Sequence, residues 1–188
     1  MRFRETSLPG AFEVLLEPHE DERGFFSRLW CAQEFAATGL PTGFVQASLS
    51  HNERSGTVRG MHFQWPPSRE GKIVRCESGS VHDVLLDLRP DSPAFLRHVA
   101  VVLNAARGNA VYIPPGIAHG FQTLEDHTRV GYVMTDFFAP HLAGGVRHDD
   151  PAFGIVWPRP VSVISQKDCD WPLFDPLTHR RRYERPVS

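Results

Sequence analysis

The sequence contains few cysteines, little net charge and no long apolar stretch. Its three cysteines, Cys31, Cys76 and Cys169, are scattered and form no C-x-x-C pair, so we expect neither a disulfide framework nor a zinc site. A formal net charge of −2 argues against nucleic acid or an anionic membrane as the main partner. No apolar run reaches the roughly 20 residues of a membrane-spanning helix. The amino-terminal MRFRETSLPG lacks the apolar segment of a secretory signal, so the expected location is the cytoplasm.

What the sequence does contain favours one all-β domain over residues 1–188. Hydrophobic residues make up 41% of the chain, which is enough to build a core, and charged residues make up 22%, as in a globular domain. Sixteen prolines and fifteen glycines separate short β-branched and aromatic runs, a pattern typical of short strands in a barrel or sandwich. Strands are predicted at residues 11–16, 25–30, 44–50, 57–63, 72–77, 80–88, 97–103, 110–113, 120–124 and 129–135. One helix is predicted over 32–39, and the basic run 179–182 is predicted to be a solvated terminus.

Residues 80–89 alternate with the period of two that a strand requires. One face of this strand carries Val81, Asp83, Leu85 and Asp87, and the other carries His82, Val84, Leu86 and Leu88. Two carboxylates therefore lie among aliphatic side chains. Two interpretations stay open: the acids are solvated on a half-exposed strand, or they pair with arginines inside a pocket. We assign neither acid a catalytic role.

Two stretches far apart in the sequence are predicted to face each other and to form the functional site. Residues 108–123 have the spacing G-x5-P-x-G-x2-H, in which glycine and proline fix a strand–turn–strand corner that directs His119 inward. This spacing resembles the second half of the cupin signature. The first half would offer a His-x-His pair and a glutamate to a metal, whereas the other stretch supplies His62 and Gln64 and continues to Lys72. Because a protonated lysine cannot bind a metal, we expect a pocket that holds none.

Further motifs are spread over nearly the whole chain. They are DERGFF at 21–26, RGMHFQ at 59–64, KIVR at 72–75, GSVHDV at 79–84, DLR at 87–89, SPAF at 92–95, IPPGIAHGF at 113–121, Tyr132, DDP at 149–151, GIVWP at 154–158 and SQKD at 165–168. In this order they resemble the nucleotide-sugar 3,5-epimerases, typified by dTDP-4-dehydrorhamnose 3,5-epimerase. The resemblance implies a cupin-type β-jelly roll with a few short helices. It also implies a homodimer with exchanged amino-terminal strands that works without metal or organic cofactor.

The resemblance assigns a chemical role to each part of the site. The family's substrate is a nucleoside-diphosphate-linked 4-keto-6-deoxyhexose, whose C3 and C5 protons can be removed because both lie next to the C4 carbonyl. By resemblance, His62 is the base and Asp168 is its partner. Lys72 lies beside the developing C4 oxyanion, and Tyr132 returns a proton on the opposite face. The implied substrate-binding residues are Arg23 and Arg59 at the diphosphate, His119 in the pocket, Phe26 of the partner subunit at the nucleobase, and the positions of Arg28, Gln46 and Phe138.

Three positions depart from the family pattern. Arg28 replaces a glutamate that contacts the nucleobase, Ser48 replaces an asparagine, and Phe138 replaces a second tyrosine near Tyr132. These changes leave the implied base and acid in place but bear on the substrate. We expect conversion of dTDP-4-dehydro-6-deoxy-D-glucose to dTDP-4-dehydro-L-rhamnose, with inversion at C3 or C5 alone, or a different nucleotide, as the alternative.

Two other classes of function remain alternatives. A metal-dependent cupin isomerase or dioxygenase would use His62, His119 and another histidine such as His51 or His82. Glutamine at position 64 counts against it, because a metal ligand is lost there. A cupin that binds sugar nucleotides without catalysis is the second alternative. Retention of the complete acid–base set counts against it, since binding alone requires no such set.

Overall fold

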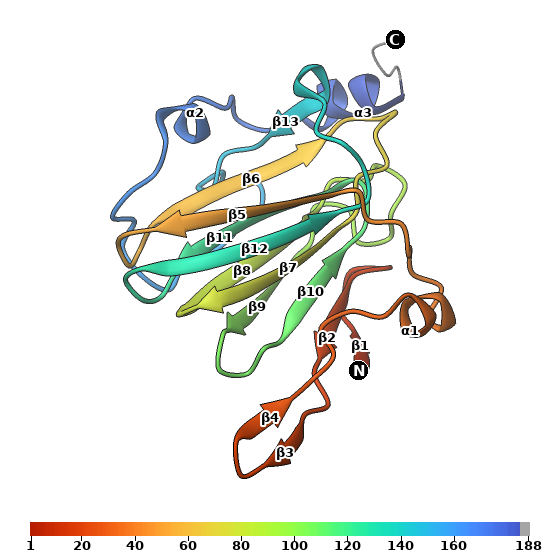
Figure 1. Cartoon of the computed structure of the whole chain (residues 1–188). Coiled ribbons are helices and arrows are strands. Elements are labelled where there is room, and N and C mark those ends of the chain that lie inside the picture. The colour runs from red at the N-terminus through yellow and green to blue at the C-terminus, as the bar shows by residue number, and fades with distance from the viewer. Residues whose placement is uncertain (185–188) are drawn as a thin grey trace.

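The chain folds into two antiparallel β-sheets that pack face to face (Figure 1). The computed structural model describes residues 1–184. One sheet has the order β1 (Arg2–Glu5), β2 (Phe12–Leu15), β10 (Ala110–Ile113), β7 (Lys72–Ser78), β12 (Thr128–Met134) and β5 (Gln46–Asn52). The other has the order β13 (Ala143–Gly145), β6 (Val58–Gln64), β11 (Ile117–Thr123), β8 (Ser80–Asp87) and β9 (His98–Asn104). The predicted all-β class is confirmed.

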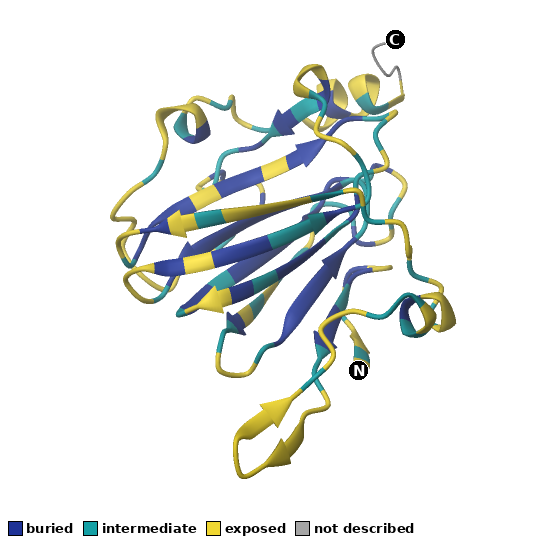
Figure 2. Cartoon of the chain, viewed as in Figure 1, coloured by how far each residue is buried: buried dark blue, intermediate teal, exposed yellow. Residues whose placement is uncertain are grey.

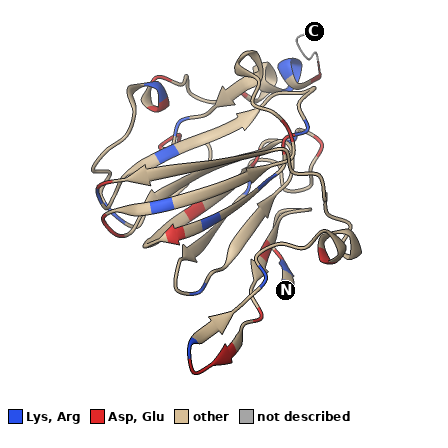
Figure 3. Cartoon of the chain, viewed as in Figure 1, with Lys and Arg blue, Asp and Glu red and all other residues tan. Residues whose placement is uncertain are grey.

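The helices are short and lie outside the sheets. They are α1 (Ala32–Ala37), the 3-10 helix η1 (Pro140–Leu142), α2 (Gln166–Cys169) and α3 (Pro176–Glu184). Within residues 1–184, no helix combines the length and the apolar character that crossing a membrane would need. Acidic and basic residues are interspersed over the sheets and loops (Figure 3).

The main core lies between the two sheets, where alternate side chains of each strand point toward the opposite sheet. The six-stranded sheet contributes Val74, Val111, Ile113 and Val130, and the five-stranded sheet contributes Val81, Leu85, Leu103, Ile117 and Phe121. Each is at most 2% exposed. Burying a side chain of this size stabilises the fold by about 2 kcal/mol, because its apolar surface leaves water.

Strand β8 is buried on both faces. The predicted alternation is confirmed: Val81 and Leu85 belong to the core between the sheets, whereas Val84 and Leu86 belong to a second cluster on the outer face of the five-stranded sheet. The chain after β13 covers that outer face, with Phe153 as one of its buried residues. In Figure 2 the interior strands are therefore mostly dark blue.

The two acids of β8 are buried and paired. Asp83 and Asp87 are both 0% exposed, so the interpretation as solvated acids on a half-exposed strand is wrong. Asp87 pairs with Arg89, the Oδ2–Nη2 distance being 2.6 Å. Asp83 instead pairs with His119. Burial of both faces of the strand leaves a carboxylate no access to water, so each needs a charged or hydrogen-bonding partner.

The carboxy-terminal basic run is part of helix α3, and the prediction of a solvated terminus is wrong for His179. This side chain is 5% exposed, and its Nε2 lies 2.7 Å from the carbonyl oxygen of Leu88. Burial lowers the pKa of His179, although its bond to Leu88 opposes the shift. The guanidinium of Arg182 stacks over the Trp65 ring at 4.4 Å, a favourable cation–π geometry. The run therefore helps to close the outer face of the five-stranded sheet.

Strands β3 (His19–Asp21) and β4 (Gly24–Phe26) form a hairpin that projects away from the sandwich (Figure 1). All six of their residues are exposed, and the hairpin is yellow throughout in Figure 2. Phe25 and Phe26 are 57% and 77% exposed. The predicted strand over 25–30 extends only to Phe26. Two adjacent exposed phenylalanines on an isolated hairpin are typical of a surface that another chain covers.

Candidate active site

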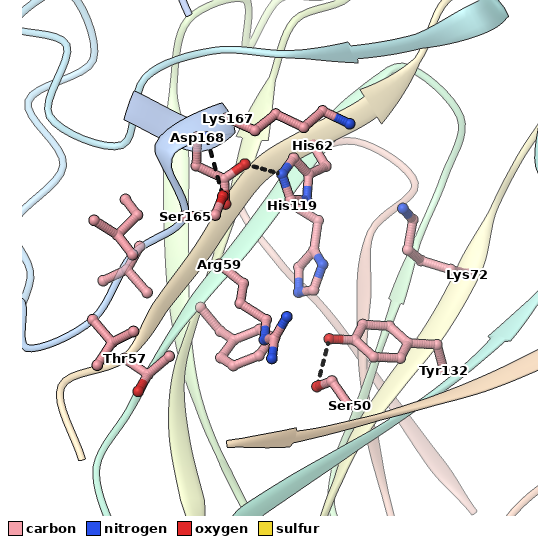
Figure 4. Close-up of a pocket in the computed structure, with 14 residues that line it drawn as sticks. Ser50, Thr57, Arg59, His62, Lys72, His119, Tyr132, Ser165, Lys167 and Asp168 are labelled. Carbon is pink, nitrogen blue, oxygen red and sulfur yellow. Dashed lines mark hydrogen bonds and ion pairs between the residues drawn. The ribbon is translucent and has the colours of Figure 1, made fainter. Parts of the chain in front are cut away.

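A cavity of about 520 Å³ opens between β6, β7, β11 and β12 and the segment that precedes α2. A second lobe of about 390 Å³ shares four of its lining residues, His62, Lys72, Tyr132 and Lys167. Figure 4 shows His62, His119, Lys72 and Tyr132 converging on the same space. Eight of the eleven residues predicted for the site line one lobe or the other: His62, Lys72, Tyr132, Asp168, Arg59, His119, Gln46 and Phe138.

The two predicted stretches are hydrogen-bonded neighbours in one sheet. Strands β6 and β11 pair antiparallel with His62 opposite His119. A Cβ atom on Gly60 would lie 2.6 Å from the Cα of Gly120, so only glycine permits this close approach. The corner before β11 was predicted, with Gly116 at a φ of 82°. Strand β11 begins at Ile117 rather than at residue 120, which places His119 within the strand.

His62 and Asp168 form a hydrogen-bonded pair although 106 positions separate them. The Nε2 of His62 lies 2.6 Å from Oδ1 of Asp168. Helix α2 holds this carboxylate, and Ser165 caps that helix by accepting a hydrogen bond from the backbone N–H of Asp168. The backbone N–H of Gly60 donates to the other carboxylate oxygen at 3.3 Å. Burial works to raise the pKa of Asp168, but its bonds to His62 and Gly60 prevail and hold the pKa below the usual value.

A carboxylate that stays ionised determines which nitrogen of His62 carries the proton. Asp168 is only 4% exposed and can accept but not donate while it is charged. The ring nitrogen that faces it is therefore the protonated one, and the other nitrogen keeps its lone pair. Because the His62 side chain is 47% exposed, that lone pair is accessible from the cavity. The pair has the arrangement of a general base with an orienting carboxylate.

His119 forms a second imidazole–carboxylate pair deeper in the site. Its Nε2 lies 2.7 Å from Oδ2 of Asp83, and both side chains are buried. His119 was predicted to lie in the pocket, but Asp83 was not predicted to be its partner. The inward position of Asp83 in the alternating run was the available signal. Burial restricts His119 to contacts within the pocket, whereas His62 is open to a ligand.

Tyr132 directs its hydroxyl toward the cavity from β12 (Figure 4). The hydroxyl oxygen lies 3.4 Å from Oγ of Ser50, and the ring packs edge-on to His119 with centroids 6.2 Å apart. Burial raises the pKa of Tyr132 to about 12. The phenol is therefore protonated at neutral pH and can act as a proton donor.

The cations of the site are held by different partners. Lys72, at the start of β7, places Nζ 2.9 Å from Oε1 of Glu70. Arg59 donates from Nε to the side-chain oxygen of Asn52 at 2.7 Å and from Nη2 to the carbonyl oxygen of His51 at 3.3 Å, and its side chain lines the cavity. Lys167 precedes Asp168 and lines both lobes. Three positive side chains around one cavity favour an anionic ligand.

The second lobe carries the residues expected near the nucleotide and the second tyrosine position. Phe138 and Ser48 line it together with Gln46. The side-chain oxygen of Gln46 accepts a hydrogen bond from the backbone N–H of Phe138 at 3.2 Å, so the two expected positions are adjacent. Trp171, which was not among the predicted site residues, lines the same lobe.

The remaining three predicted residues do not line the cavity of their own chain. Arg23 pairs with Asp21 at the hairpin turn, and Phe26 is 77% exposed on the same hairpin. Arg28 pairs with Glu34 of α1 at 2.8 Å. Their predicted contacts with substrate would have to be made in another subunit's cavity.

Comparison with known proteins identifies the family. A family model described as dTDP-4-dehydrorhamnose 3,5-epimerase matches residues 5–176. The chain belongs to this family. A dTDP-4-dehydrorhamnose 3,5-epimerase from Sinorhizobium fredii is 38% identical over 169 residues, which cover 88% of this chain and 87% of the relative. The resemblance inferred from the sequence motifs is confirmed, and with it the isomerase class.

Solved structures of this epimerase family have the same fold. The dTDP-4-dehydrorhamnose 3,5-epimerase of Bacillus anthracis, solved with TDP and PPi bound, gives a TM-score of 0.89 at 33% identity and covers 92% of this chain and 99% of its own. The family also contains relatives with a narrower activity. A dTDP-4-dehydrorhamnose 3-epimerase from Streptomyces niveus is 36% identical over 171 residues, covering 90% of this chain and 82% of the relative. The predicted cupin-type fold is confirmed.

The histidines of this family member do not gather into a metal-ligand set in the cavity. Across residues 1–184, the one group of ligand atoms close enough to share a metal is His51, Glu53 and His127, which are all exposed. His62 and His119 each engage a carboxylate instead. Gln64, at the position of the lost cupin ligand, donates to Glu70. The arrangement favours acid–base chemistry over the metal-dependent alternative.

Proposed function

We propose that this protein is an epimerase that inverts C3 and C5 of dTDP-4-dehydro-6-deoxy-D-glucose to give dTDP-4-dehydro-L-rhamnose. The observation that carries the proposal is the meeting of the His62–Asp168 pair and the Tyr132 hydroxyl in one cavity. A base and a protonated phenol supply the two groups that inversion at a carbon next to a carbonyl requires. Close relatives with this activity name support the same substrate class.

Each inversion begins with proton removal. The unprotonated nitrogen of His62 takes the proton from C3 or C5, and the electron pair moves onto the C4 oxygen as an enolate. Asp168 stabilises the imidazolium that forms. The ammonium of Lys72 stabilises the negative charge on oxygen, an interaction that strengthens as the charge develops. Tyr132 then donates its proton to the opposite face of the carbon, and the C4 carbonyl re-forms with the configuration inverted.

The diphosphate is bound by guanidinium groups. A guanidinium group such as that of Arg59 can form paired hydrogen bonds with phosphate oxygens. Arg59 and His62 line the same lobe, so a ligand whose diphosphate contacts Arg59 can place its sugar beside His62. Arg23 and Phe26 supply a second guanidinium and an aromatic face for the nucleobase from a partner subunit, and Arg28 lies at the same edge.

A mono-epimerase is the second candidate. Phe138 lines the lobe next to Tyr132 and provides no hydroxyl there. The Streptomyces niveus relative is named as a 3-epimerase, and the 3'-monoepimerase of Streptomyces bikiniensis, solved with dTDP-quinovose, gives a TM-score of 0.84 at 29% identity. Release of the sugar after one inversion would give such an activity without any change in the base.

Deuterium exchange tests the proposal. Incubating dTDP-4-dehydro-6-deoxy-D-glucose with the protein in deuterium oxide is expected to give a product with deuterium at both C3 and C5, because each inverted carbon receives a solvent-derived hydron. Proton NMR of the isolated sugar nucleotide reports each position. Exchange at one carbon alone would establish the mono-epimerase instead. Absence of exchange with this substrate and with other 4-keto-6-deoxy sugar nucleotides would reject both candidates.

The functional unit is a homodimer with exchanged amino-terminal hairpins. The hairpin β3–β4 projects from its own chain and exposes two phenylalanines, and three predicted binding residues lie on or just after it. Covering two aromatic side chains removes their apolar surface from water, which favours association. In the dimer, each cavity has its acid–base set from one chain and Arg23 and Phe26 from the other.

Mixing two inactive variants distinguishes exchange from a hairpin that serves its own chain. Arg23→Ala/Phe26→Ala damages the hairpin, and His62→Asn damages the base. Co-expressed with different affinity tags and purified as the mixed dimer, these chains are expected to recover activity at one of the two sites, about half the wild-type rate per dimer. That site has an intact cavity and an intact hairpin from different chains. A mixed dimer as inactive as its parents would contradict exchange.

A further inference from the structure

A chain of hydrogen bonds leads from the backbone of Ala139, next to the second lobe, to the ammonium of Lys72. The backbone N–H of Ala139 donates to the side-chain oxygen of Gln64 at 3.1 Å. The amide nitrogen of Gln64 donates to Oε2 of Glu70 at 2.7 Å. The other oxygen of Glu70 lies 2.9 Å from Nζ of Lys72. Both ends of the Gln64 amide and both oxygens of Glu70 are therefore engaged.

The loop that carries Glu70 is fixed independently of this chain. The backbone N–H of Glu70 donates to Oγ of Ser68 at 3.2 Å, and that hydroxyl donates to Asp136 at 3.0 Å. The backbone N–H of Gly71 donates to Oγ1 of Thr135 at 2.8 Å. The loop is thus tied to the residues that follow β12. A carboxylate held by both its backbone and its neighbours presents a fixed acceptor to Lys72.

The pair is largely withdrawn from water. The side chains of Lys72 and Glu70 are 13% and 10% exposed. A lysine has a four-carbon stem with considerable rotamer freedom, and a pairing partner in a partly dry site restricts that freedom. Since an ammonium group has three N–H donors, a bond to Glu70 leaves two for a ligand. Lys72 lines both lobes, and its ammonium nitrogen faces the space that His62 and Tyr132 also line (Figure 4).

We propose that Glu70 is a positioning residue, which, together with Gln64, aims the Lys72 ammonium at the place where the C4 oxygen of the substrate becomes negative. This inference rests on the proposed function, which gives Lys72 its role at that oxygen. Glu70 touches no reacting atom and acts through Lys72 alone. Stabilisation of an oxyanion depends on hydrogen-bond donors that are already in place when the charge develops. A Lys72 ammonium that is no longer held in position therefore lowers kcat more than it raises KM.

A double-mutant cycle tests the proposal with the full-length protein. Glu70→Ala is expected to lower kcat by about tenfold and to change KM by less than about threefold, because the ammonium loses its fixed direction. In a Lys72→Met background the same change is expected to alter kcat by less than about twofold, since there is no ammonium left to aim. Glu77→Ala removes an exposed carboxylate from the same strand, β7, and serves as the control.

Each result of the cycle has a defined meaning. A loss of equal size in both backgrounds would show a structural role and overturn the proposal, as would a kcat of Glu70→Ala within twofold of wild type. Failure of the wild-type protein to exchange or epimerise any 4-keto sugar nucleotide would reject the proposed function, a different outcome. If Glu70→Ala folds poorly, Glu70→Gln replaces it in the cycle. The amide has one acceptor oxygen in place of two and carries no charge, so it can accept from the Gln64 amide or from the Lys72 ammonium but not from both, and the ion pair with Lys72 is lost at constant side-chain size.

Discussion

Replacing His62 with asparagine is expected to lower kcat for epimerisation by about a thousandfold, because general base catalysis of this kind contributes two to four orders of magnitude. Asparagine can still donate a hydrogen bond to Asp168, but its amide cannot accept a proton at neutral pH. Deuterium incorporation at C3 and C5 is expected to fall by the same factor, since proton removal precedes both exchange and inversion. NMR time courses in deuterium oxide measure both rates in one sample.

The control for this substitution is His127→Asn. His127 is an exposed residue with a left-handed φ of 53°, a conformation that asparagine tolerates well. His127 lies outside both lobes of the cavity. The epimerisation and exchange rates of the His127→Asn protein are therefore expected to equal those of the wild type. If His62→Asn kept more than a tenth of the wild-type exchange rate, another group would have to be the base.

Tyr132→Phe is expected to separate exchange from inversion. The substitution keeps the ring packed against His119 but removes the proton donor. His62 can still take a proton, exchange it with solvent and return deuterium to the face it came from. We therefore expect inversion to slow by about a hundredfold while exchange with retention of configuration becomes the main reaction. The ratio of deuterated starting sugar to inverted product, measured by NMR, reports the separation.

The pKa of Tyr132 also predicts how the inversion rate of the wild-type protein depends on pH in the alkaline range. Burial raises the pKa of Tyr132 to about 12, so the phenol keeps its proton as pH rises from 7 to 10. Its loss as an acid is expected only as pH approaches 12. A Tyr132→Phe protein whose inversion rate matched the wild type would require a different proton donor, and Ser50→Ala serves as a milder comparison because it removes only the neighbour of the hydroxyl.

Local sequence patterns predicted most of the strands, because residues that point toward the core alternate along a strand with residues that point away from it. The strand at 110–113 was predicted to the residue, and β7 and β8 to within one residue. Strands β1, β3 and β13 were missed. β13 is Ala-Gly-Gly, which has no alternation to detect, and it exists because it pairs with β6. Helix α3 was missed because its one buried residue, His179, is polar.

A site residue could be predicted where it belongs to a sequence motif. A contact between two residues that only the fold brings together could not be predicted. His62 and Asp168 were paired by family resemblance, since no local signal relates positions 106 apart. Asp83 and Glu70 were not assigned roles. Alternation indicates that Asp83 points inward, but its partner His119 is set by strand register, and Glu70 meets Lys72 through a loop conformation, so neither partner can be read from spacing. The resemblance therefore supplied the base with its carboxylate and the acid, and the structure supplied the carboxylates that hold His119 and Lys72.

The place of Asp168 in the chain has a consequence for synthesis. Both sheets are complete in sequence by Gly145, the last residue of β13, and domains generally begin to fold from the amino end as the polypeptide leaves the ribosome. The carboxylate that gives His62 its tautomer arrives 23 residues later, on a four-residue helix. A nascent or prematurely terminated chain that ends between these points has an imidazole with no carboxylate beside it. Chemical competence is thus withheld until the ribosome has translated the chain past α2.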